Sequence, residues 1–328
     1  MLGLAPVACF LATLVLLDSY KLVRLPLVVG TVAAGLAMSG VSYLVADALL
    51  RSVSFEGATF TRYVAPLTEE LLKAAVILAL IRGNRIGFLV DAAILGFAVG
   101  TGFALGETIH YLRVAGGAGI GTWIARGFGT AIMHGGATAI FAVMGLAMLE
   151  RSAGARWRPL LPGLALAIVL HSVYNHFFLS PFASAIGIAV ALPVILNTVF
   201  ARSEAAIGEW LGKGFDADAD MLSMIDSGRL SDAPMGKYLH QLKDRFQGPI
   251  VADLLCYVRL HTELALRAKG ILMMRETGFD VPVDEPTREK FAELGYLEKS
   301  IGRTGRLAIQ PMLHMSHRDL WQIYMLGK

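Results

Sequence analysis

Seven apolar runs fill the first 200 residues and constrain the fold more than any other feature of this sequence. A hydrocarbon core of about 30 Å needs roughly 20 apolar residues per helix, and every run except the short first one is about that long or longer. They cover residues 2–17, 26–50, 64–82, 86–112, 123–149, 158–180 and 182–200. Only Ser180 and Pro181 separate the last two, which predicts a tight hairpin or one broken helix. We therefore expect an all-α polytopic transmembrane helix bundle with about seven spans, six or eight being the alternatives.

Charged residues divide the chain into two parts. Residues 1–200 hold 12 Lys/Arg and 8 Asp/Glu, whereas residues 201–328 hold 17 and 18. The whole chain is only 17% charged, against about 25% in soluble proteins, which argues against an ordinary cytosolic enzyme. We expect a transmembrane bundle over 1–200 and a helical soluble domain over 201–328. A net charge of +3, divided in this way, leaves no basic groove and argues against nucleic acid as a partner.

Positive charge in the loops predicts the orientation in the membrane. Loops one, three and five together carry seven basic residues and loops two and four carry three, and the richer side faces the cytoplasm. The seven are Lys21, Arg24, Arg82, Arg85, Arg151, Arg156 and Arg158, and the three are Arg51, Arg62 and Arg113. We therefore expect a multi-pass protein of the inner membrane, with its amino terminus outside and residues 201–328 in the cytoplasm.

Ionisable side chains lie within the apolar runs, where each costs several kcal/mol and usually lines a site or cavity. Asp47, Asp91 and Arg126 lie near span ends, and a structural role is expected for them. The others are Glu69, Glu70, Lys73, Glu107, His110, His134, His171 and His176. Glycines at four-residue spacing accompany them, notably Gly96 and Gly100, and predict close approach of helix backbones.

The depth of these side chains suggests one shared site. If the amino terminus is outside, four of these side chains lie in the outer halves of four different spans. Each is roughly 8 to 17 Å from the outer end of its span, and the four are Glu70, Glu107, His134 and His171. Spans alternate in direction, so random placement would scatter the four between leaflets. Lys73 is close enough along its helix to pair with either Glu69 or Glu70. His176, five positions after His171, is expected to point elsewhere.

Two carboxylates and two imidazoles allow two chemistries at such a site. They can bind a divalent metal such as zinc, with Glu70, Glu107, His134 and His171 as ligands and a spare carboxylate as base. Alternatively a glutamate activates water without a metal, and the histidines stabilise the oxyanion. Both schemes hydrolyse an amide or ester, and Glu70 is the candidate base.

The motif series resembles the PrsW family of intramembrane proteases, which is related to the prenyl-protease and bacteriocin-processing membrane enzymes. The series comprises Glu69-Glu70-x-x-Lys73, Phe103-x-x-x-Glu107, His134 within MHGGAT, and His171-x-x-x-Asn175. The resemblance implies an intramembrane endopeptidase with Glu69, Glu70, Glu107, His134 and His171 at the active site, supported by Lys73 and Asn175. It also implies a membrane-anchored protein substrate, such as an anti-sigma factor cut at site 1 near the outer face. Asn175 stands where the family often has Asp.

The carboxyl-terminal part shows helical periodicity without a catalytic motif. Helices are expected over 203–212, 219–226, 234–246 and 250–276, and a short one from about Thr287. Asp216, Asp218 and Asp220 mimic the start of a calcium loop, but the Gly and Glu that such a loop needs are missing. A regulatory or partner-binding role is expected.

Two other classes of protein compete with the protease reading. An ion-coupled transporter would use the intramembrane Glu and His residues as a relay. It would be favoured by internal repeats, and neither EELLKAA nor ALGETIH has a second copy. A structural scaffold accounts for the polar tail but leaves the clustered acids unexplained.

Overall fold

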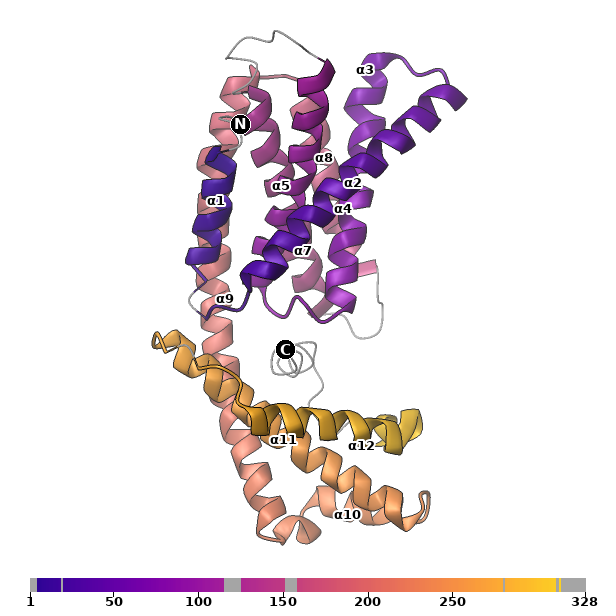
Figure 1. Ribbon diagram of the computed structural model, residues 1–328, viewed down its shortest axis with the longest axis vertical. Helices are drawn as coiled ribbons and strands as arrows, with labels where there is room; N and C mark the ends of the chain where they lie inside the picture. Colours follow the sequence, from indigo (N-terminus) through magenta and orange to yellow (C-terminus); the bar gives the residue numbers. More distant parts are fainter. Residues whose placement is uncertain are drawn as a thin grey trace. The chain divides into compact units, whose positions relative to one another are not determined.

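The computed structural model describes residues 5–18, 20–114, 125–150, 158–279, 281–310 and 313. Every regular element in these ranges is a helix, which confirms the all-α class. The chain forms two compact units, Met1–Glu204 and Ala205–Lys328. Figure 1 shows the helices of both units, coloured in sequence order from indigo at the amino terminus to yellow at the carboxyl terminus.

The first unit is a bundle built around α5. Its helices include short π and 3-10 segments (η) where the chain enters α4, α7 and α8. They are α1 (Ala5–Leu16), α2 (Leu25–Ser52), α3 (Gly57–Thr59), η1 (Phe60–Val64), α4 (Ala65–Arg82), α5 (Leu89–Val114), η2 (Ala125–Thr130), α7 (Ala131–Glu150), η3 (Arg158–Leu160), α8 (Leu161–Asn175) and the first part of α9 (Pro181–Asp226). Helix α5 packs most extensively against α7 and α2, and α8 packs against α7 and α4.

Glycines let α5 lie in backbone contact with both neighbours. A Cβ on Gly100 would stand 2.2 Å from the carbonyl oxygen of His134 in α7. On the other side, a Cβ on Gly102 would stand 2.0 Å from the carbonyl oxygen of Val32 in α2. No larger residue fits at these crossings, so the close approach predicted from the glycine spacing is present.

Helices occupy all seven apolar runs, but only some meet the requirements for a span. By length and composition, four helices in the described ranges can cross a membrane: Leu25–Ser52, Leu89–Tyr111, Phe128–Glu150 and Ala183–Asp226. Helix α1 has 12 residues and α8 has 15, and α4 carries Glu69, Glu70, Lys73 and Arg82 within 18. The count of seven spans therefore stays a prediction.

The structure decides how α8 and α9 are connected. Helix α8 ends at Asn175, Phe177 takes a positive φ of 53°, and α9 starts at Pro181. The two runs are therefore separate helices. Helix α9 has 46 residues in all and continues past Pro193 to Asp226, so the stretches 203–212 and 219–226 are helical as expected but belong to one helix instead of two. The residues after 200 favour continuation of the α9 helix, because ion pairs between residues four positions apart stabilise a helix. Glu209 and Lys213 form such a pair at 2.6 Å.

The second unit contains the end of α9 followed by η4 (Arg229–Asp232), α10 (Pro234–Leu242), α11 (Gly248–Glu276) and α12 (Glu285–Ile309). Helices α11 and α12 pack together. Asp284 caps α12 by accepting a hydrogen bond from the backbone N–H of Thr287 at 3.3 Å. The 25 residues of α12 exceed the short helix expected, and Gly302, with a positive φ of 62°, makes a kink that divides α12 into two helical pieces.

A partly buried ion pair joins α9 to α11 within the second unit. Lys269 is 3% exposed, and its Nζ lies 2.6 Å from Asp218 and 5.1 Å from the ring centroid of Trp210. Gly214 leaves room for it, since a Cβ there would stand 2.7 Å from the ammonium. Asp218 therefore lies inside a helix and neutralises a lysine.

Candidate functional site

Helix α4 supplies three polar side chains to the interior of the first unit. The π-helix η1 runs without a break into α4, so Pro66 lies inside a continuous helix, and its missing N–H leaves a carbonyl oxygen of η1 without an intrahelical donor. Glu70 and Lys73 follow at a spacing of three residues and face the same side. Both are buried, at 2% and 0% exposure, so α4 turns charged groups into the bundle.

Lys73 bridges α4 and α7. Its Nζ lies 2.5 Å from Oε1 of Glu70 and 2.8 Å from Nδ1 of His134. The ammonium also stands 4.9 Å from the ring centroid of Phe103 in α5. A buried charge needs such partners, because an unpaired ammonium would be strongly destabilising in this low-dielectric interior.

His171 of α8 contacts both glutamates of α4. Its Nδ1 lies 2.9 Å from Oε1 of Glu70, and its Nε2 lies 3.9 Å from Oε2 of Glu69. That Glu69 oxygen is buried and has no hydrogen-bond partner. Since a buried carboxylate oxygen normally has a partner, Glu69 Oε2 is a position where a ligand is expected.

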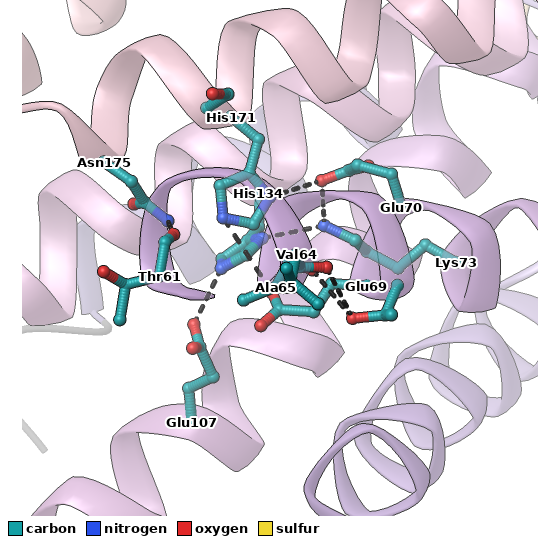
Figure 2. A network of polar contacts seen from close by, with 12 residues as sticks. Thr61, Val64, Ala65, Glu69, Glu70, Lys73, Glu107, His134, His171 and Asn175 are labelled. Carbon is teal, nitrogen blue, oxygen red and sulfur yellow. Dashed lines mark hydrogen bonds and ion pairs between the residues drawn. The ribbon is translucent and has the colours of Figure 1, made fainter. Parts of the chain in front are cut away.

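His134 of α7 completes the network and joins it to α5. Its Nε2 lies 2.7 Å from Oε2 of Glu107, and its ring packs 4.7 Å from that of His171, edge to face. Figure 2 shows the five predicted site residues and Lys73 converging from α4, α5, α7 and α8. They come from the start of α4 and α7 and the end of α5 and α8, which all lie at one end of the bundle.

Asn175 lies beside this network and has a different partner. Its side-chain N–H donates to the carbonyl oxygen of Thr61 at 2.9 Å, and Ser172 donates to that of Arg62 at 2.7 Å. Both bonds hold η1 against α8. The structure therefore gives Asn175 a supporting position, which orders the segment leading to Glu69 and Glu70.

The two remaining histidines lie outside the network. His110 stacks on Tyr43 with ring centroids 4.2 Å apart. His176 contacts the carbonyl oxygen of Ser172 and the hydroxyl of Tyr63, at 2.7 Å and 3.0 Å. The structure thus gives His176 partners away from Glu70 and His134, as its spacing predicted.

The acids assigned structural roles near span ends have local partners. Asp47 pairs with Arg51 on the exposed face of α2. Asp91 accepts hydrogen bonds from the backbone N–H groups of Gly87 and Phe88, at 2.8 Å and 3.0 Å, and so caps the start of α5. The side chain of Arg126 lies outside the described residues.

Three of the predicted site residues could together hold a metal ion. One ligand atom each from Glu69, His134 and His171 lies within 4.8 Å of the other two. One carboxylate and two imidazoles suit zinc, and this three-ligand set leaves a position open for water. The unpartnered Oε2 of Glu69 fits the same assignment. Glu70 and Glu107 instead contact the histidines, as outer carboxylates commonly do around metal-binding histidines.

Comparison with known families identifies the class of protein. A family model described as PrsW family intramembrane metalloprotease matches residues 21–200, which is 180 of the 328 residues. The chain belongs to the PrsW family. No curated protein and no solved structure matches it.

Membership of the PrsW family establishes that this membrane protein is an intramembrane metalloprotease, with a membrane-embedded protein as substrate. The match covers all four motifs and gives the transporter alternative no support. What the motifs did not show is the part played by Lys73, which bonds to His134 on another helix. Its spacing from Glu69 and Glu70 predicted only a pairing within its own helix.

An apolar cavity of about 380 Å³ lies between α7, α8 and α9. Met133 and Leu170, which line it, directly precede the two site histidines in sequence. Successive helical residues point about 100° apart, so the cavity lies on a different face of these helices from the polar network.

Proposed function

We propose that Glu69, His134 and His171 hold a zinc ion, and that this site hydrolyses a peptide bond of a membrane-anchored protein. The observation that carries the proposal is the unpartnered, buried Oε2 of Glu69 beside the two histidines. Bound zinc would lower the pKa of a water molecule and polarise the scissile carbonyl. Membership of a metalloprotease family implies a metal, and a donor set of one carboxylate and two imidazoles favours zinc.

The other two glutamates orient the histidines in this proposal. Oε1 of Glu70 accepts from both Lys73 and His171, so it already has two donors. This favours a positioning role for Glu70 over the role of base predicted from its sequence setting. The side chain of Glu107 is 24% exposed, so it is the carboxylate that water reaches most readily and the better candidate to accept a proton. In a scheme without metal, Glu69 would be the base.

We place the site near the outer face of the inner membrane, because loop charges favour an external amino terminus and a cytoplasmic domain over 201–328. Site-1 cleavage of an anti-sigma factor is the substrate class that this position supports. Residues 201–328 then act as a regulatory or partner-binding domain. The topology is tested by adding protease to intact cells, where external digestion of this domain would contradict it.

The experiment that tests the function combines cleavage with metal analysis. Purified full chain is reconstituted with a membrane-anchored reporter, and its metal content is measured in parallel. Glu69→Gln and His134→Ala should each lower cleavage by at least about a hundredfold and reduce bound zinc. His176→Ala is the matched control and should retain both. Near-normal cleavage by both site variants would require the protease site to be placed elsewhere.

A further inference from the structure

Lys73 fixes the protonation pattern of His134. An ammonium has three N–H donors and no acceptor, so Nδ1 of His134, 2.8 Å away, must accept and carry the lone pair. The ring proton of neutral His134 is then on Nε2, which donates to Glu107 Oε2 at 2.7 Å. Both ring nitrogens of His134 are therefore occupied by protein partners.

The same matching of hydrogen-bond donors to acceptors assigns the ring proton of His171, but one of its ring nitrogens stays available to a ligand. Its Nδ1 faces the Glu70 carboxylate, which can only accept, so Nδ1 carries the proton. Nε2 then has the lone pair and lies 3.9 Å from Glu69 Oε2. Each histidine donates one N–H to a carboxylate and directs its other nitrogen towards a ligand, the arrangement typical of metal-binding histidines. For His134, the nitrogen that remains is the one in contact with Lys73.

We infer that Lys73 competes with the metal for Nδ1 of His134. A lone pair cannot serve an ammonium and a metal ion at once, and the two cations repel each other across a buried site. Metal binding therefore moves the Lys73 ammonium away from His134 while Glu70 can retain it. Without metal, Lys73 bonds to both buried side chains, His134 and Glu70, and so stabilises the metal-free form. This inference rests on the proposed metal site and assigns Lys73 as a positioning residue that sets metal affinity.

The test is a zinc titration of the purified full chain against a chromophoric chelator, which needs no cleavage. Lys73→Met keeps the apolar stem and removes the ammonium, so zinc should bind at least about tenfold more tightly, the factor that corresponds to about 1.4 kcal/mol. Lys213→Met is the matched control. It removes the same charge from an exposed ion pair with Glu209 and should leave zinc affinity unchanged.

The outcomes separate this inference from the proposed function. If Lys73→Met binds zinc as tightly as the wild type, or more weakly, the proposed competition is wrong. The proposed metal site would still be supported, because both proteins bind zinc. Failure of both proteins to bind zinc would overturn the metal site and the competition together. If Lys73→Met does not fold, nitrogen NMR of the unaltered protein decides: the contact between Lys73 Nζ and His134 Nδ1 should disappear with saturating zinc. Its persistence in the zinc-bound protein would contradict the inference.

Discussion

Nε2 of His134 and Oε2 of Glu107 lie 2.7 Å apart and join α7 to α5 at the candidate site. This bond orients the ring that carries the proposed metal-binding nitrogen. Glu107→Gln can preserve the contact through its amide oxygen but loses the negative charge. Removing an outer carboxylate of this kind typically costs 10- to 100-fold in metal affinity or activity, so we expect zinc affinity to fall by about that factor.

The measurement for Glu107→Gln is zinc affinity and cleavage rate on the same preparation. A fall in both would fit an orienting role combined with proton transfer. Unchanged zinc affinity with a large loss of cleavage would assign Glu107 to proton transfer alone. Unchanged values for both would contradict any role.

Glu70→Gln tests the second orienting carboxylate. The amide can still accept from Lys73 or His171, but the buried ammonium then lacks its charge partner. We expect lower stability together with weaker zinc binding, in contrast to Glu69→Gln, which removes a ligand whose Oε2 has no hydrogen bond to lose. Thermal unfolding of the metal-free proteins distinguishes the two. Equal stability losses would contradict the division of roles between the adjacent glutamates.

Removal of the metal should abolish cleavage reversibly. Incubation with a chelator, followed by dialysis, should reduce activity by at least about a hundredfold, because the metal supplies the activated water. Zinc should restore it, whereas magnesium should not, since magnesium prefers oxygen ligands. Full activity in chelator with no bound metal would select the glutamate scheme with Glu69 as base.

Gly100→Ala should disturb the site through the backbone. Its Cβ would meet the carbonyl oxygen of His134 at 2.2 Å, so α5 and α7 must separate, at a cost of about 1–3 kcal/mol. Gly30→Ala in α2 is the matched control, because nothing lies within 4 Å of a Cβ there. It should be neutral or stabilising by up to about 1 kcal/mol. Thermal unfolding in detergent measures both, and equal effects would contradict the packing at this crossing.

We expect the phenol of Tyr257, in the second unit, to titrate at unusually alkaline pH. Burial, with the nearby Glu298 carboxylate, raises the pKa of its phenol from 10.0 to about 12. The neutral form is therefore favoured by folding, and this stabilisation is complete below pH 10 and lost as the pH rises towards 12. Tyrosinate absorbance of the full chain, compared with that of Tyr257→Phe, should show this late titration. A normal titration near pH 10 would contradict the burial of Tyr257.

Local sequence patterns determined the helices and the choice of site residues. Apolar runs predicted where helices lie because backbone groups in lipid must pair within their own segment. Ionisable residues such as Glu70 and His134 stood out because they are costly there and need partners. The boundary after residue 200 was harder to predict, since a polar helix can continue an apolar one without a break, as α9 does to Asp226.

Only the tertiary structure decided which atoms meet. Sequence spacing placed Lys73 beside Glu70 on one helix, but the contact with His134 crosses 61 positions and depends on how α4 packs against α7. Likewise, Glu69 and Glu70 are adjacent and chemically identical, and their sequence setting favoured Glu70 as the base. Packing gives Glu70 two donors and leaves Oε2 of Glu69 unpartnered beside the histidines. The reason is geometric: neighbouring residues on a helix point about 100° apart, so their surroundings are set by other helices.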